Sequence, residues 1–252
     1  MKAALLADVG KMVVRDVPDP SVPPSEVLIM VKAVGVCRID LHLFRGDANY
    51  NLDSQGHPIP LAVQPQILGH EFCGEILELG SEVRDLERGD RVLCDQGRNC
   101  VSQNRWPRCP YCRSGDPRLC DHYGEHGVTG LPGAKADYIA MPAANCLKLP
   151  DGMPMELGAL VEPLGRVIHA SDRVDRSHSR YSFEGERRIS NVLIYGAGPS
   201  GLLFLQYLRC VKHLEGLILV ADVRERICTL PRNSAGLRLT SNVRTYWRRW
   251  LN

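Results

Sequence analysis

Three cysteines of this chain, Cys109, Cys112 and Cys120, share one short segment with the spacing C-x2-C-x7-C. Thiolates at such spacing hold a tetrahedral zinc ion once a fourth ligand joins them, and Cys100 lies just upstream. Three buried core cysteines are the alternative, but residues 108–121 are too polar to favour it. We therefore predict a structural zinc site at these four cysteines.

A second candidate metal site combines Cys37 with His70 and Glu71. A cysteine, a histidine and a carboxylate can form a catalytic zinc site that leaves one position for water or substrate. Spacing alone supports this weakly, because a histidine beside a glutamate is more often an ordinary surface or core pair. The residue types by themselves leave both interpretations open.

The third candidate site is a glycine-rich turn, Gly196-x-Gly198-x-x-Gly201, between a strand pattern at 191–195 and a helical pattern at 202–214. In a dinucleotide-binding βαβ unit, the first glycine allows the tight turn and the second lets the pyrophosphate approach. The third glycine packs the helix against the strand. The alternative is a purely structural turn, but the order strand, turn, helix favours a nucleotide site.

Asp222 follows the next strand pattern, at 217–220, where a dinucleotide site places an acidic residue against the ribose hydroxyls. Its charge repels the 2′-phosphate of NADP, so we expect NAD as the cofactor. Arg224, two residues further on, leaves NADP open as the alternative.

The composition, with 44% hydrophobic and 24% charged residues among 252, is typical of a soluble globular protein. No apolar run reaches the roughly 18 residues of a membrane span, and the apolar residues 1–6 are too few for a signal peptide. We therefore expect a cytoplasmic protein without a membrane partner. That compartment keeps thiols reduced, which favours metal over disulfides for the ten cysteines.

The charge is unevenly distributed along the chain. Residues 223–252 hold seven arginines and one glutamate, so the net charge of +2 leaves about −4 on residues 1–222. The body therefore offers no basic surface to a nucleic acid, and we expect no nucleic-acid partner. A nucleic-acid-binding zinc module, built from the cysteine segment and the basic tail, is the weakest alternative.

The order of patterns predicts a β-rich, barrel-like region followed by an α/β region. Apolar stretches separated by Gly/Pro turns indicate short strands in the first 150 residues. The spacing of apolar residues predicts a helix over 155–170, and the polar segment 171–190 is predicted to be a linker. The predicted strands are 3–6, 11–15, 26–34, 72–79, 91–94 and 137–141.

Five stretches, in order, resemble the motifs of zinc-dependent medium-chain alcohol and polyol dehydrogenases. They are residues 35–42, Gly-His-Glu-Phe-Cys-Gly (69–74), Gly-Asp-Arg-Val (89–92), the cysteine segment, and Glu-Pro-Leu (162–164) ahead of the glycine turn. The last resembles the sorbitol, threonine and glucose dehydrogenase branch. The resemblance implies a GroES-like catalytic domain over 1–170, a linker over 171–190, and a Rossmann domain over 191–252.

The resemblance also implies roles for single residues. Cys37 and His70 would bind the catalytic zinc, Glu71 would bind it or support a residue that does, and Glu162 would bind it directly or through water. Asp40 would orient the imidazole of His70. Arg38 would reach the cofactor pyrophosphate.

The chain departs from the family pattern at Ile39, where the family has a hydroxyl that starts a proton relay. His42 would then be disconnected, and the proton would leave by water or through Glu71. The first family cysteine falls at Trp106 when counted back from Cys109, but at Cys100 when counted forward from residues 89–92. We favour Cys100, because a loop can absorb an insertion and tryptophan cannot bind zinc.

The resemblance ends early in the dinucleotide-binding part. A complete Rossmann domain has about six strands, only 63 residues remain from Ser190 onwards, and 228–252 lose the family pattern. We therefore expect a partial Rossmann domain with an atypical basic tail, in a truncated chain that binds zinc and shows little or no turnover. The predicted activity is hydride transfer between an alcohol or polyol and NAD(P). An inactive zinc-binding remnant is the alternative, and the family suggests a homo-oligomer.

Overall fold

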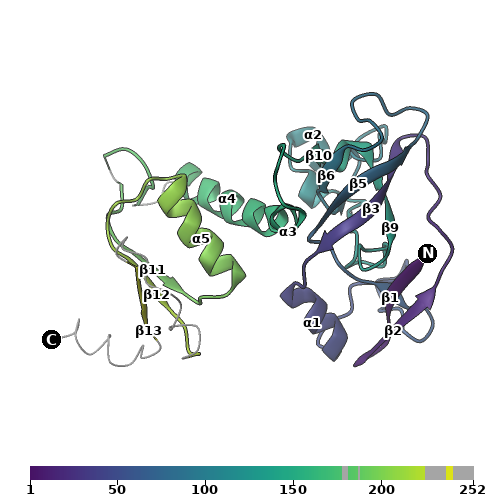
Figure 1. Ribbon diagram of the computed structural model, residues 1–252, viewed down its shortest axis with the longest axis horizontal. Helices are drawn as coiled ribbons and strands as arrows, with labels where there is room; N and C mark the ends of the chain where they lie inside the picture. The colour runs from purple at the N-terminus through teal and green to yellow at the C-terminus, as the bar shows by residue number, and fades with distance from the viewer. Residues whose placement is uncertain (178–180, 187, 225–236, 241–252) are drawn as a thin grey trace. The chain divides into compact units, whose positions relative to one another are not determined.

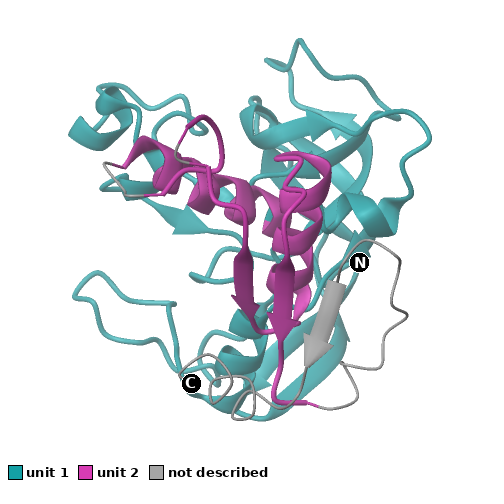
Figure 2. Ribbon diagram, turned by 90° about the vertical axis from the view of Figure 1, so that its left-hand side faces the viewer, with its two compact units in different colours: residues 1–162 teal, residues 163–252 magenta. Residues whose placement is uncertain are grey.

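The computed structural model describes residues 1–177, 181–186, 188–224 and 237–240 (Figure 1). The chain divides into two compact units, Met1–Glu162 and Pro163–Asn252 (Figure 2). Most of the basic tail, including Cys228, lies outside the described residues.

The first unit is built around a five-stranded antiparallel sheet in the order β10-β6-β5-β3-β9. Alternate residues of the long strands point into one core: Val27 and Ile29 of β3 and Ile76 of β5 are fully buried. This alternation follows from the two-residue period of a strand, and it explains why these strands could be predicted. The strands are β3 (Glu26–Val34), β5 (Phe72–Leu79), β6 (Arg91–Cys94), β9 (Tyr138–Pro142) and β10 (Cys146–Lys148).

Two smaller antiparallel sheets complete the strands of this unit. One has the order β2-β1-β4, and the other is the pair β7-β8. The strands are β1 (Lys2–Asp8), β2 (Lys11–Asp16), β4 (Gln66–Ile67), β7 (Gly97–Arg98) and β8 (Gly124–Glu125). All six strands predicted from the sequence of this region are present, whereas β4, β7, β8 and β10 were not predicted.

Short helices interrupt the strands of the first unit. The longest, α1 (Arg38–Arg45), begins directly after Cys37 and ends at Gly46, whose φ of 76° is the left-handed conformation that favours glycine. The others are α2 (Pro110–Ser114), α3 (Met155–Gly158) and the 3-10 turns Pro117–Leu119 and Ala143–Asn145. The sequence had not predicted α1.

The second unit contains a parallel sheet in the order β11-β12-β13, with α5 connecting the first two strands. Its core contains Ile194 of β11, Ile218 and Val220 of β12, and Leu208 of α5. The elements are α4 (Val161–Arg176), β11 (Val192–Tyr195), α5 (Pro199–Cys210), β12 (Ile218–Ala221) and β13 (Leu237–Thr240). Residues 171–176 of the expected linker are thus the end of a helix.

These elements confirm the predicted fold class, a β-rich domain followed by a partial α/β Rossmann domain. Among the described residues, no helix is both long enough and apolar enough to cross a bilayer.

Candidate functional site

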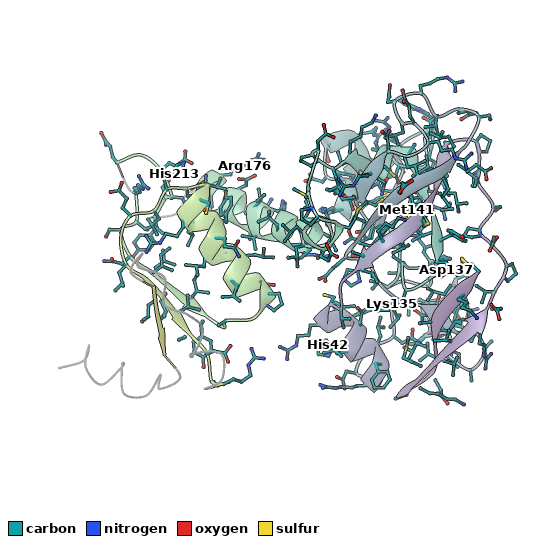
Figure 3. The ribbon with its side chains drawn as sticks, viewed as in Figure 1. His42, Lys135, Asp137, Met141, Arg176 and His213 are labelled. Carbon is teal, nitrogen blue, oxygen red and sulfur yellow. The ribbon has the colours of Figure 1, made fainter. Side chains whose placement is uncertain are left out.

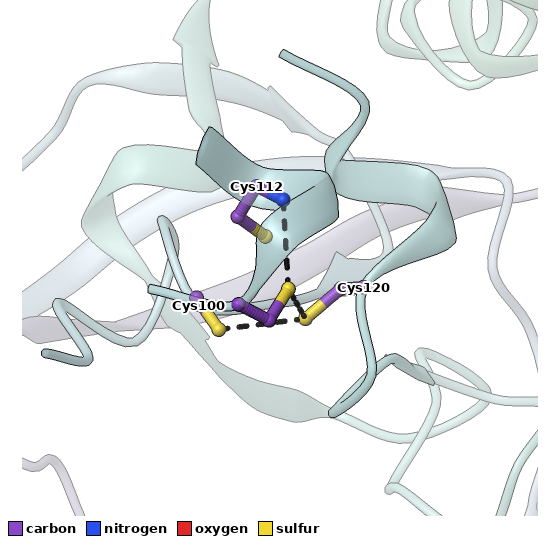
Figure 4. A group of neighbouring side chains, drawn as sticks. Cys100, Cys112 and Cys120 are labelled. Atoms are coloured by element: carbon purple, nitrogen blue, oxygen red, sulfur yellow. Dashed lines mark hydrogen bonds between the residues drawn. The ribbon is translucent and has the colours of Figure 1, made fainter. Parts of the chain in front are cut away.

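The four cysteines of the first candidate site come together in one lobe of the first unit, formed by residues 99–123 (Figure 4). The Sγ atom of Cys120 lies 3.6 Å from that of Cys100 and 3.8 Å from that of Cys109. A tetrahedral zinc ion with Zn–S bonds of about 2.3 Å separates its sulfurs by about 3.8 Å. The four sulfurs, all buried, therefore have the spacing that a zinc ion requires.

Local sequence explains this arrangement. Cys109 is the N-cap of α2, Pro110 fills the first helical position, and the N–H of Cys112 points at the sulfur of Cys109 at 3.5 Å. The N–H of His122 approaches the sulfur of Cys120 at 3.3 Å. Backbone N–H groups aimed at sulfur stabilise thiolates, which are the form that binds zinc.

The thiol pKa values show the same effect. Burial raises the pKa of Cys109, but the N–H groups of Cys112 and Asp121 outweigh it and bring this pKa to about 6. Burial and the neighbouring Cys120 raise the pKa of Cys112 to about 12. The backbone N–H groups thus favour the thiolate form of Cys109, and a bound metal ion would favour that form at its other cysteine ligands.

The second candidate site brings together Cys37, His70 and Glu71, whose potential ligand atoms lie within 4.8 Å of one another. The antiparallel register of β3 and β5 explains this convergence, because Val34 pairs with Phe72 and the residues that follow Val34 run beside those that precede Phe72. The N–H of Gly35 donates to the carbonyl of Glu71 at 2.7 Å, which fixes the two segments together.

The groups in this second site fit a zinc ion. His70 is only 1% exposed, and its buried Nδ1 atom has no hydrogen-bond partner among the described residues. A buried polar atom without a partner is costly, and a metal ion would remove that cost. Burial raises the pKa of the Cys37 thiol, and the negative charge of Glu71 raises it further. A cation between these side chains would compensate both effects.

Asp40 does not hydrogen-bond to His70, contrary to our expectation. Its Oδ2 atom accepts from the N–H of Cys37 at 3.0 Å and from the Lys135 ammonium at 2.6 Å. Its Oδ1 atom has no partner in the part of the chain that the structure describes. The physical reason is the position of Lys135, labelled in Figure 3, in the irregular segment before β9. The N–H of Lys135 donates to the carbonyl of Leu68 at 2.9 Å, and its ammonium reaches Asp40. The carboxylate therefore caps α1 and neutralises a lysine.

Glu162 stands outside the three-residue set of Cys37, His70 and Glu71. Its Oε1 atom accepts from Nε2 of Gln96 at 2.9 Å, and the same nitrogen donates to Glu125 at 2.8 Å. Gln96 is 1% exposed. The sequence had not indicated Gln96, because no motif links it to residues 29 and 66 positions away.

The remaining predicted residues of the first unit lie on α1. Arg38 is exposed, and Ile39 packs against the cluster around Leu43. His42, labelled in Figure 3, has its Nδ1 atom 3.1 Å from Oδ2 of Asp47. An isoleucine at the position between Arg38 and Asp40 offers no hydroxyl to carry a proton.

The glycine turn of the second unit has the conformation that its sequence predicts. Gly196 has φ of 112°, and Gly198 is the N-cap of α5. A Cβ at Gly201 would collide with the carbonyl of Gly196, whereas one at Gly198 would meet no atom of the described residues within 4 Å. The third glycine therefore allows close packing of helix and turn, and the second leaves the start of the helix open to a ligand.

Asp222 is buried, and both of its oxygens are already engaged. It accepts from the N–H of Ala197 at 2.9 Å, and Arg224 donates to it from its backbone N–H at 2.9 Å, Nε at 3.0 Å and Nη2 at 3.1 Å. The Arg224 guanidinium holds the pKa of this carboxyl well below its usual range. A ribose would have to share Asp222 with Arg224.

Gly69, which precedes His70, provides a test of the backbone at this site. It has φ of 100°, and an added Cβ would lie 2.9 Å from Cγ2 of Val34 and 3.1 Å from the nitrogen of Lys135. We expect Gly69→Ala to lower the free energy of unfolding by about 2–4 kcal/mol, combining backbone strain and overpacking. Urea denaturation of the zinc-loaded chain measures this. Gly10→Ala is the matched control, because Gly10 has φ of 70° but an added Cβ would meet no described atom within 4 Å. It should lower the free energy of unfolding by about 1 kcal/mol. Equal losses of stability in the two variants would contradict the packing argument.

Residues 23–151 match the alcohol dehydrogenase GroES-like domain family. Together with the fold, this places the chain in the family of zinc-dependent medium-chain alcohol and polyol dehydrogenases. The chain is 33% identical to L-threonine 3-dehydrogenase of Aeromonas hydrophila over 223 residues, which cover 88% of this chain and 57% of the relative. It is 36% identical to L-idonate 5-dehydrogenase of Vitis vinifera over 184 residues, covering 73% and 44%.

Solved structures give the same result. A putative zinc-binding dehydrogenase of Sinorhizobium meliloti, bound to NADP, matches 95% of this chain and 60% of its own with 30% identity and a TM-score of 0.74. Galactitol-1-phosphate dehydrogenase of Escherichia coli matches 96% and 62%, with 27% identity and a TM-score of 0.74. The chain thus spans somewhat over half the length of most of these relatives.

Proposed function

We propose that this chain has the sites of a zinc-dependent oxidoreductase that transfers a hydride between the CH–OH group of an alcohol or polyol and NAD(P). The observation that carries the proposal is the convergence of Cys37, His70 and Glu71, with a buried imidazole nitrogen that no described residue hydrogen-bonds. Sulfur, imidazole nitrogen and carboxylate are the ligands of catalytic zinc sites that keep a position open.

In this proposal Cys37, His70 and Glu71 hold the ion. Gln96 positions Glu162, which acts as a further ligand directly or through water. Zinc bound here supplies a Lewis acid that lowers the pKa of a substrate hydroxyl. Because Ile39 cannot pass a proton, the proton leaves through Glu71 or through water. Asp40 and Lys135 keep the helix that begins after Cys37 in place.

The second unit supplies the dinucleotide site. A pyrophosphate would bind at the start of α5, where Gly198 is the N-cap and the first backbone N–H groups have no partner within the helix. Arg38 is exposed at the start of α1 and is proposed as a further pyrophosphate ligand. A nicotinamide cofactor held there would supply the acceptor for the hydride. Cys100, Cys109, Cys112 and Cys120 hold the structural zinc.

We predict a preference for NAD over NADP, determined by Asp222. Removing its charge by Asp222→Ala should weaken NAD binding about 10-fold or more, the effect of one lost hydrogen bond to a charged group, and should improve NADP binding. Arg224→Ala should do the opposite, because it removes the two guanidinium hydrogen bonds that compete with the ribose for Asp222. Dissociation constants of both cofactors in the three proteins test this. An unaltered chain that already prefers NADP would refute the role given to Asp222.

The activity is tested with the chain stripped of metal, reloaded with zinc and supplied with NAD or NADP. Suitable substrates are L-threonine, L-idonate and sorbitol, after the names of relatives, together with simple secondary alcohols. Zinc-dependent formation of NADH or NADPH supports the proposal. Zinc uptake without turnover on any substrate favours the alternative, an inactive zinc-binding remnant.

We also propose a cytoplasmic location and a homo-oligomeric state. The location follows from the buried cysteine cluster, whose thiolates need a reducing compartment to stay available for zinc. Light scattering of the purified chain tests the oligomeric state, and a monomer would contradict it.

A further inference from the structure

Two cysteines that belong to neither candidate metal site face each other in the main sheet of the first unit. Cys94 on β6 and Cys146 on β10 are direct partners in the antiparallel register, and their sulfurs are 3.7 Å apart. Cys94 is 1% exposed, while Cys146 is partly exposed. Both thiols are free in the structure.

We propose that Cys94 and Cys146 form an oxidation site that closes to a disulfide on reaction with a low-molecular-weight disulfide such as oxidised glutathione. Directly opposed residues of antiparallel strands have Cα atoms about 4.5–5.5 Å apart, within the range that a disulfide spans. The sulfurs have to approach from 3.7 Å to about 2.05 Å. Small side-chain rotations achieve this, and the strands keep their pairing.

The reaction has a defined order because the two thiols differ in access. The Cys146 thiolate attacks one sulfur of oxidised glutathione, giving a mixed disulfide and one glutathione thiolate, which takes up the proton lost by Cys146. The Cys94 thiolate then attacks Sγ of Cys146 and displaces the second glutathione, which takes up the proton of Cys94. Two protein thiols are oxidised by two electrons, and one glutathione disulfide is reduced to two thiols. Burial and the adjacent Cys146 raise the pKa of Cys94, so the second step is the slow one.

The other described cysteines lack this combination of access and partner. The four cysteines of the lobe are the proposed zinc ligands and would be protected by the ion. The Cys73 thiol donates to the carbonyl of Met155 at 2.9 Å, and Cys210 is exposed on α5 in the second unit. A bond between Cys94 and Cys146 would join the two strands that bracket the whole lobe, 52 residues apart in the chain.

The test uses the zinc-loaded chain carrying Cys210→Ser and Cys228→Ser, so that neither of these two cysteines forms links between chains. After incubation with oxidised glutathione, the protein is denatured with a chelator, alkylated, digested and analysed by mass spectrometry. We expect a cross-linked peptide pair containing Cys94 and Cys146, loss of two alkylatable thiols, unchanged zinc content, and full reversal by dithiothreitol.

Two variants separate the steps. Cys94→Ser should stop at the mixed disulfide on Cys146, while Cys146→Ser should take up no glutathione, because Cys94 is buried. Cys94→Ala replaces the first variant if the serine does not fold, as judged by zinc content. Three results would overturn the proposal: both thiols stay alkylatable in the unaltered pair, the cross-link forms within the lobe with loss of zinc, or Cys146 stays unmodified in both Cys94 variants.

Discussion

Replacing Cys112 with serine will remove zinc from the cysteine lobe and unfold that lobe. Cys112 is buried, and its sulfur is one of four that converge, with no other polar group of the set to replace it. Binding of a structural zinc ion contributes about 10–16 kcal/mol in small zinc domains, so the loss of one thiolate has a large effect. We expect the zinc content to fall by one ion per chain and amide protons of residues 99–123 to exchange rapidly.

Cys210→Ser is the control for this experiment, because Cys210 is an exposed cysteine of the second unit. It should keep the full zinc content and the protection of the lobe. A Cys112→Ser protein that retains its metal and its lobe would show that the four sulfurs do not act together as ligands.

The second large effect is expected at Cys37. We expect Cys37→Ser to remove the metal of the second site and to leave the zinc of the cysteine lobe. Any turnover that the unaltered chain shows should fall by about 1,000-fold or more in this variant. The magnitude reflects the several kcal/mol that a Lewis acid contributes. Cys37 is the N-cap of α1, where serine is a preferred residue, so the helix should persist.

Metal analysis and circular dichroism of the same samples distinguish the two sites. Cys112→Ser should lose only the lobe zinc, and Cys37→Ser only the other ion. An unchanged metal content in Cys37→Ser would show that Cys37 is not a metal ligand, whatever the activity of the variant.

Much of the fold was predictable because the long strands repeat with a clear period. The two-residue alternation of β3, with Val27 and Ile29 buried, marks a strand without further information. The helix α1 escaped prediction, since it has only eight residues and starts after a cysteine instead of a usual cap. The two-residue strands β4, β7 and β8 are too short for any period.

The site was predictable where its residues are close in sequence and less so where distant segments meet. The cluster of Cys109, Cys112 and Cys120 follows from local spacing alone. The contact of Asp40 with Lys135 joins positions 95 apart, and no pattern in the sequence reports it. The pairing of Asp222 with Arg224 is local, but its geometry depends on how β12 ends.

The two-stranded pair β7-β8 has a consequence for how this protein family can vary. Gly97 pairs with Glu125 and Arg98 with Gly124, so the lobe 99–123 leaves and re-enters the domain at one narrow base. Residues can therefore be added between Cys100 and Cys109 without shifting the register of any other strand, and four converging sulfurs can tolerate loops of different length. We therefore expect the lobe to act as a separable unit. Transplanting residues 99–123 onto another two-residue β ladder should transfer zinc binding to the recipient protein.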